Sequence, residues 1–152
     1  MLEKVRRILF IVLAGAMLFM LVSCGKNHER DLTDVITSVS WEMTKSGVKD
    51  LAGNPDKVED TYFAYEGEYL GYAGEYIYGF DDDNKLRFIK FIFNDEDVAS
   101  ELINTFKNRY GDPDKIIDNG VQAYWWYGNV AGEDSLLALD ISANLVEVDK
   151  EE

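Results

Sequence analysis

The first 24 residues consist of a charged segment, an apolar segment and a short ending of small residues. Lys4, Arg6 and Arg7 precede an uncharged stretch over residues 8–22, which reads ILFIVLAGAMLFMLV. In a helix this stretch would span roughly 22 Å, less than the roughly 30 Å hydrocarbon core of a bilayer. Its length is typical of a secretory signal peptide rather than of a stable transmembrane helix.

Two later segments have apolar residues at helical spacing. The first covers residues 44–52, and Thr44 stands where an N-cap is expected. The second covers residues 98–110, where one apolar face is formed by Val98, Leu102, Ile103, Phe106 and Tyr110. The acidic run over residues 94–97 precedes this helix, where carboxylates suit the positive end of the helix dipole.

Most of the remaining chain is rich in aromatic and branched residues, which favour β-strands. The pattern predicts strands over residues 60–66, 75–80, 86–93, 121–127 and 135–148, the last broken near residues 143–144. Residues 81–85 (DDDNK) form a turn in this prediction. A calcium loop of the EF-hand type is excluded, because Leu86 and Ile92 occupy its required Gly and Glu positions.

A repeat joins the two halves of the chain. Residues 49–58 and 107–116 share the pattern K-x-x-x-G-x-P-D-K-[V/I] at an offset of 58 residues. In each copy the Gly is suited to end a helix, the Pro prevents its continuation, and Val58 or Ile116 begins a strand. We therefore expect an α+β domain over residues 35–148. Two helix-then-antiparallel-strand repeats, 35–93 and 94–148, would form one sheet with the helices packed on one face.

The end of the apolar segment resembles a bacterial lipoprotein signal. Leu21, Val22, Ser23 and Cys24 match its lipobox, and Cys24 is the only cysteine in the chain. The resemblance implies attachment of diacylglycerol to Cys24, removal of residues 1–23, and a location on the outer side of the cell membrane, or on an outer membrane if the organism has one. Residues 24–34 would then be a polar tether and residues 149–152 an acidic tail. The alternative is an uncleaved signal anchor with an incidental cysteine.

A second resemblance concerns the first helix. The run Trp41-Glu42-Met43-Thr44, followed by Val48, Leu51, Gly53 and Pro55, is similar to the signature G-M-T-x-x-x-V-x-x-L-x-G-x-P. That signature marks SmpA/OmlA-type lipoproteins of outer-membrane assembly and relatives with the β-lactamase-inhibitor-protein-like fold. Glu42 stands where that family usually has Gly. The resemblance implies a tandem-repeat fold and a protein-binding role in the cell envelope.

Charge and composition narrow the range of functions that this chain can have. The chain has 15 Lys and Arg against 29 Asp and Glu, a net charge of −14, which disfavours nucleic acid as a partner. Its one Cys and one His, His28 in the tether, exclude a disulfide framework and a His-based metal cluster. We predict no catalytic residue, cofactor or metal. A small carboxylate-based enzyme or ligand-binding domain remains the alternative from another class.

Aromatic residues suggest where a partner would bind. The candidate protein-binding surface consists of Tyr69, Tyr72, Tyr76, Trp125 and Trp126. Because neighbouring residues of a strand point to opposite faces, one of the two tryptophans should face the helices and the other the open face of the sheet. The acidic charge favours a basic envelope protein as the partner. Two alternatives stay open: inhibition of an extracytoplasmic peptidase or hydrolase, and aromatics that only stabilise the sheet.

Overall fold

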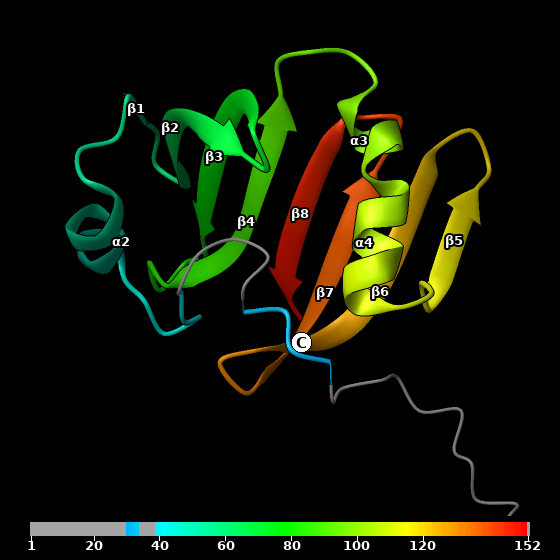
Figure 1. Ribbon diagram of the computed structural model, residues 1–152. Helices are drawn as coiled ribbons and strands as arrows, with labels where there is room; N and C mark the ends of the chain where they lie inside the picture. The colour runs from blue at the N-terminus through cyan, green and yellow to red at the C-terminus, as the bar shows by residue number, and fades with distance from the viewer. Residues whose placement is uncertain (1–29, 34–38, 152) are drawn as a thin grey trace, which may run out of the picture.

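The computed structural model describes residues 30–33 and 39–151, and shows one eight-stranded sheet with three short helices (Figure 1). The strands are β1 (Lys57–Val58), β2 (Tyr62–Tyr69), β3 (Tyr72–Phe80), β4 (Leu86–Phe93), β5 (Lys115–Asp118), β6 (Gln122–Val130), β7 (Glu133–Asp140) and β8 (Leu145–Lys150). The helices are α2 (Lys45–Ala52), α3 (Val98–Glu101) and α4 (Ile103–Tyr110). This architecture confirms the predicted α+β class. The signal segment and Cys24 lie outside the described residues.

The sheet has the strand order β1-β2-β3-β4-β8-β7-β6-β5, and all neighbouring strands are antiparallel. Strands from the first half of the chain therefore lie on one side of the β4–β8 pair, and strands from the second half lie on the other (Figure 1). The predicted strand over residues 86–93 coincides with β4. The predicted break near residues 143–144 is also confirmed, because β7 ends at Asp140 and β8 begins at Leu145.

The register of the strands defines two faces of the sheet. One row of directly opposite residues crosses six strands and is formed by Phe63, Tyr78, Ile89, Val148, Leu137 and Trp126. All six are buried, with exposed fractions of 5% or less. We call this side the core face. The opposite side, which carries Trp125, Ala138, Glu147, Lys90 and Ile77 in the neighbouring row, is called the open face.

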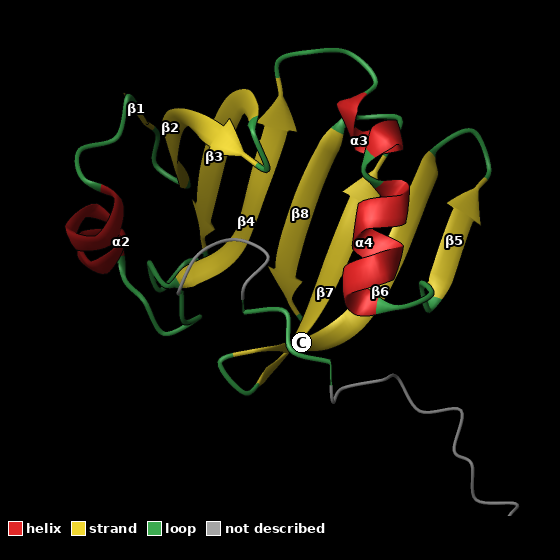
Figure 2. Ribbon diagram, in the orientation of Figure 1, coloured by secondary structure: helices red, strands yellow, loops and turns green. Residues whose placement is uncertain are grey.

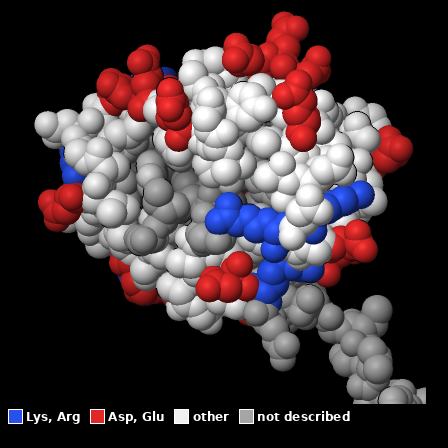
Figure 3. Space-filling model, in the orientation of Figure 1, with Lys and Arg blue, Asp and Glu red and all other residues white. Residues whose placement is uncertain are grey.

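The helices contact residues of the core face. The ring of Phe106 in α4 lies 5.8 Å from that of Trp126, and α4 crosses in front of the sheet in Figure 2. In α2, Val48 is fully buried and the Lys49 ammonium lies 4.9 Å from the ring of Phe63. Seen from this side, many acidic side chains lie around the rim (Figure 3). None of the helices in the described ranges is long and apolar enough to cross a membrane.

The helix predicted over residues 98–110 is divided at Leu102 into α3 and α4. The acidic run before it does not supply a side-chain cap, since Asp97 has a left-handed backbone (φ 64°) and makes no capping hydrogen bond. The side chain of Asn144, in the β7–β8 turn, caps the helix instead. Its Oδ1 accepts from the Ala99 amide at 3.0 Å and its Nδ2 donates to the Asp95 carbonyl at 2.7 Å. Tertiary contact thus replaces the local cap that the sequence suggested.

The prediction of a tether over residues 24–34 is wrong for residues 30–33. Leu32 is only 1% exposed, and its amide donates to the Asn129 carbonyl at 2.8 Å. The segment passes close to Gly128, where a Cβ atom would lie 2.3 Å from the Arg30 carbonyl oxygen. The buried Leu32 side chain and backbone hydrogen bonds with Asn129 of β6 thus hold this segment against the sheet.

The prediction of an acidic tail over residues 149–152 is also wrong for residues 149–151. Asp149 and Lys150 belong to β8, and the Glu151 amide donates to the Asp134 carbonyl at 3.0 Å. The strand continues because Asp149 lies opposite both Phe88 of β4 and Leu136 of β7, so its backbone is paired on both sides.

Candidate functional site

The five candidate residues do not form one surface. Tyr69 and Trp126 are buried, with exposed fractions of 8% and 0%, and the prediction that they contact a partner is wrong. Tyr69 packs between Phe91 and Phe93 in the core. Trp126 packs on α4, and its Nε1 donates to the Gly111 carbonyl at 2.9 Å. Both therefore stabilise the fold.

Tyr72 and Tyr76 also lie on the core face, towards its edge, and both are partly exposed. The Tyr72 hydroxyl donates to the Glu101 carboxylate of α3 at 3.2 Å. The Tyr76 hydroxyl donates to the Glu68 carbonyl at 2.7 Å, and its ring lies 4.5 Å from that of Phe91. Four of the five candidates thus lie on the core face. Within β2, β3 and β6 they are an even number of residues away from Phe63, Tyr78 and Trp126, which define that face.

Trp125 is the candidate that lies on the open face. It is partly exposed and stands opposite Lys115 of β5 and Ala138 of β7. The Lys115 ammonium lies 4.6 Å from the centre of the indole ring, a cation–π distance. The two tryptophans point to opposite faces, as the alternation of a strand requires.

Further apolar residues share the open face with Trp125. They are partly exposed and comprise Ile77, Phe88, Ile92, Leu136, Leu145 and Tyr127. Phe88 lies over Gly79 of the neighbouring strand, where a Cβ atom would be 2.1 Å from the Phe88 ring. Sequence reasoning missed this set. The signal was present in β4, whose sequence LRFIKFIF has apolar residues in both phases of the alternation.

Two ion pairs cross the middle of the open face. Lys90 and Glu147 lie 3.1 Å apart with their side chains 25% exposed, and Arg87 lies 3.9 Å from Asp149. Burial raises the pKa of Asp149, and the charge of Glu147 raises it further, against the opposing effect of Arg87. The centre of the face therefore combines apolar side chains with charges that are mostly paired.

One end of the open face is acidic. A shallow groove of about 630 Å³ follows the β2–β3 hairpin and is lined by Glu66, Glu68, Glu75, Asn94, Gly67, Ala73 and Gly74. Glu66 and Glu75 are directly opposite each other in the strand pairing. Like charges in this position repel one another, so the groove carries a concentrated negative potential.

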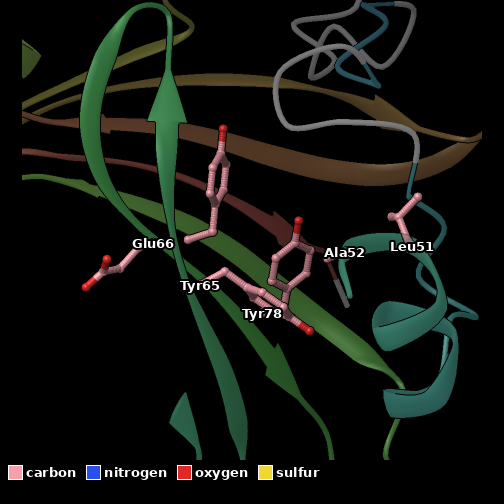
Figure 4. Close-up of a pocket in the computed structure, with 6 residues that line it drawn as sticks. Leu51, Ala52, Tyr65, Glu66 and Tyr78 are labelled. Atoms are coloured by element: carbon pink, nitrogen blue, oxygen red, sulfur yellow. The ribbon is translucent and has the colours of Figure 1, made fainter. Parts of the chain in front are cut away.

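A second pocket lies between the end of α2 and the β2–β3 hairpin (Figure 4). It has a volume of about 300 Å³ and is lined by Leu51, Ala52, Tyr65, Glu66, Tyr76 and Tyr78. The Glu66 side chain points away from the tyrosines in Figure 4. Burial raises the pKa of Tyr65 and of Tyr76, so both hydroxyl groups stay protonated at neutral pH. Besides Glu66, the pocket offers aromatic rings and neutral hydroxyl groups.

The acidic run that begins at Asp81 has a structural explanation. Asp81 closes the β3–β4 turn, since its Oδ1 accepts from the amides of Asp83 and Lys85, both at 2.9 Å. In the part of the chain that the structure describes, no group of three or more His, Cys, Asp or Glu side chains is arranged to hold a metal ion.

Comparisons with known proteins give little further information. No protein-family model matches this chain, and a search of the curated proteins gives no match. Among solved structures, the chain is similar to the crystal structure of a DUF4309 family protein (YjgB) from Bacillus subtilis subsp. subtilis str. 168. The TM-score is 0.47 at 14% sequence identity, and the alignment covers 71% of this chain and 78% of that chain. A similarity of this size says nothing about function.

Proposed function

We propose that this chain is a lipid-anchored, extracytoplasmic protein-binding domain of the cell envelope and that the open face contacts the partner. The observation that carries the proposal is the position of Trp125. This indole lies partly exposed on the face opposite the helices, within a set of partly exposed apolar side chains. Aromatic residues surrounded by apolar and charged neighbours are the usual anchors of protein interfaces.

The charge of the open face favours a basic partner. The groove with Glu66, Glu68 and Glu75 adjoins the apolar centre, because Glu75 lies opposite Ile92 in the strand pairing. A partner with Lys or Arg beside an apolar strip would match both regions, and its charges would speed association and fix its orientation.

The proposed anchor rests on the lipobox and the single cysteine at Cys24. Diacylglycerol on the thiol and an acyl chain on the new amino terminus would hold the domain firmly, since stable anchoring takes more than one chain. Cys24→Ser should abolish labelling by radioactive fatty acid and leave the precursor unprocessed. Normal processing of this variant would refute the anchor.

We also propose that the domain is a tandem repeat whose helices cover one face of the sheet. Two matched helix ends support this. Gly53 and Gly111 end α2 and α4 with φ values of 87° and 81°. The carbonyl of each accepts a hydrogen bond from an aromatic side chain of the core face, Tyr65 at 3.2 Å and Trp126 at 2.9 Å.

The segments after the two helices are also alike. Asp56 and Asp114 occupy equivalent positions of the repeated sequence pattern. The Asp56 carboxylate accepts from the Glu66 amide and the Asp114 carboxylate from the Tyr127 amide, each at 2.8 Å. Each aspartate thus ties the segment after a helix to the second strand that follows it, β2 or β6.

Photo-crosslinking in intact cells tests the protein-binding proposal. A photoreactive amino acid would replace Leu136 on the open face or, as a matched control, Asn108 on the exposed side of α4. We expect one dominant crosslinked protein from the open-face position only. Equal products from both positions, or none from Leu136, would contradict the proposal. Recovery of a peptidase or hydrolase would favour the inhibitor alternative.

A further inference from the structure

The pocket between the end of α2 and the β2–β3 hairpin adjoins a helix with small side chains. At the 58-residue offset of the repeated pattern, Val48 of α2 stands at the position of Phe106 of α4. Ala52 likewise stands at the position of Tyr110. Phe106 and Tyr110 are buried, and the ring of Phe106 lies 5.7 Å from that of Tyr110 and 5.8 Å from that of Trp126. Rings therefore fill the space under α4, whereas Ala52 lines an open pocket beside α2.

The strands beside the two helices differ as well. Tyr65 of β2 corresponds to Trp126 of β6, since each donates to the carbonyl of the glycine that ends its helix. The residue opposite Tyr65 is Tyr76, and the residue opposite Trp126 is Leu137. Leu137 is 0% exposed, whereas Tyr76 is partly exposed and lines the pocket. The first half of the chain thus combines a small helix residue with tyrosines in the strands.

The polar groups of this pocket whose bonds are defined act as hydrogen-bond acceptors. A tyrosine hydroxyl has one hydrogen to donate, and those of Tyr65 and Tyr76 are donated to backbone carbonyls at 3.2 Å and 2.7 Å. The Glu66 amide donates to the Asp56 carboxylate at 2.8 Å. These groups leave oxygen lone pairs and a carboxylate for a ligand. An anion or a sugar, which requires donors from the protein, matches them poorly.

The charge around the pocket is negative. Glu66 lines both this pocket and the acidic groove of the β2–β3 hairpin. Among the described residues that line the pocket there is no Lys or Arg. The lysines of α2 lie over other rings, Lys45 at 5.5 Å from the centre of Phe80 and Lys49 at 4.9 Å from that of Phe63. Aromatic rings attract cations, and an acidic rim raises their local concentration.

We propose that the pocket binds a small, free organic cation with an alkylated nitrogen, such as a trimethylammonium compound. The Glu66 side chain points away from the tyrosines in Figure 4, so it does not offer its carboxylate to a cation among the rings. A primary ammonium is strongly hydrated and has three hydrogens to donate. An alkylated ammonium has little hydration to lose and is held by contact with aromatic rings.

The size and the order of the pocket suit such a ligand. Its volume of about 300 Å³ is at the lower end of the range for ligand pockets, so it admits a compact ion. The rings of Tyr65 and Tyr78 are 5.5 Å apart at 82°, and that of Tyr76 lies 4.5 Å from Phe91. These contacts hold the rings before a ligand binds, which lowers the entropic cost of binding. The proposal is independent of the lipid anchor and of the open face, because the three tyrosines lie on the core face.

Titration with choline tests the proposal. The full chain is kept in a sugar-based detergent that contains no ammonium group, and binding is followed by the NMR shift of the Ala52 amide. The control probe is the neutral analogue of choline in which carbon replaces the nitrogen. We expect choline to bind roughly 5- to 30-fold more tightly than this analogue. Equal affinities, or no binding of choline, would refute the proposal.

Glycerophosphocholine distinguishes a free cation from a lipid headgroup. It carries the same trimethylammonium group beside a phosphate, which Glu66 at the rim should repel. We therefore expect weaker binding of glycerophosphocholine than of choline. Tighter binding would contradict a free compound as the ligand and would assign the pocket to a lipid headgroup.

Two pairs of variants test the position of the site, and urea unfolding confirms that each variant folds. Ala52→Tyr introduces the side chain found at the equivalent position of α4 and should abolish choline binding. Ser46→Tyr, at an exposed position of the same helix, should leave it unchanged. Tyr76→Leu should weaken choline binding about five-fold or more, whereas Tyr76→Phe keeps the ring and should retain it. Unchanged affinity in Ala52→Tyr, or equal affinities in the two Tyr76 variants, would refute this site.

Discussion

The substitution Leu32→Ala tests whether residues 30–33 belong to the folded domain. Leu32 is 1% exposed and packs beside Val39, Trp41, Val130 and Val148. Truncating a leucine in such a site costs about 2–5 kcal/mol, through lost burial and the cavity that remains. A domain of this size is stable by about 5–15 kcal/mol, so the variant should still fold at room temperature and its loss can be measured.

Leu51→Ala is the matched control, because Leu51 is 46% exposed and the same atoms are removed. An exposed truncation of this kind should cost less than about 1 kcal/mol. Urea unfolding followed by tryptophan fluorescence provides the measurement. With a slope of about 2 kcal/mol per molar urea, Leu32→Ala should lower the midpoint by roughly 1–2.5 M at an unchanged slope. Equal midpoints for the two variants would refute the packing of this segment.

Two further perturbations test the cap of α3 and the charge of the open face. Asn144→Gly keeps the positive φ accessible and removes the side-chain bonds to Ala99 and Asp95, so stability should fall by about 1–3 kcal/mol. Hydrogen exchange should accelerate at the Ala99 amide, and unchanged exchange there would contradict the assigned cap. Asp149→Asn removes a carboxyl group whose pKa is raised by burial above its ordinary value of 3.8. Ionisation of such a group favours the unfolded chain, so the variant should gain stability relative to the unchanged protein as the pH rises through 3.8 and above. Urea unfolding at several pH values measures this, and a relative gain on acidification would show that the sign is wrong.

The elements that local pattern determines were predicted well. β4 has the expected bounds because LRFIKFIF is rich in aromatic and branched apolar residues and is followed by a polar, acidic run. α2 begins after Thr44, whose hydroxyl accepts from the Gly47 amide at 3.4 Å, and ends before Gly53, as capping and terminating residues predict.

The binding surface was predicted poorly. Alternate residues of a strand point to opposite faces of the sheet, but this rule does not say which of the two sets is buried. The run Tyr124 to Tyr127 is aromatic in both phases, and only the contact of Trp126 with Phe106 of α4 decides that Trp126 is inside and Trp125 outside. When a strand is covered by a helix on one side and carries apolar residues on the other, its sequence does not alternate between polar and apolar residues. The buried side of such a strand is therefore not predictable from alternation.

Long-range contacts account for the other errors. Asn144 caps a helix that begins some 45 residues earlier in the chain, and no local pattern encodes such a pair. Leu32 is a lone apolar residue in a polar segment, so its burial follows from the space beside Gly128 rather than from any periodicity.

The most direct measurement of the central claim is partner recovery by crosslinking and mass spectrometry from cells that carry Trp125→Ala. Ile116→Ala is the matched control, since Ile116 is 55% exposed in β5, next to Lys115, but belongs to the other face of the sheet. Loss of an aromatic anchor costs about 2 kcal/mol or more, so recovery should fall at least tenfold for Trp125→Ala and remain unchanged for Ile116→Ala. Equal recovery from both variants would contradict a binding function of the open face.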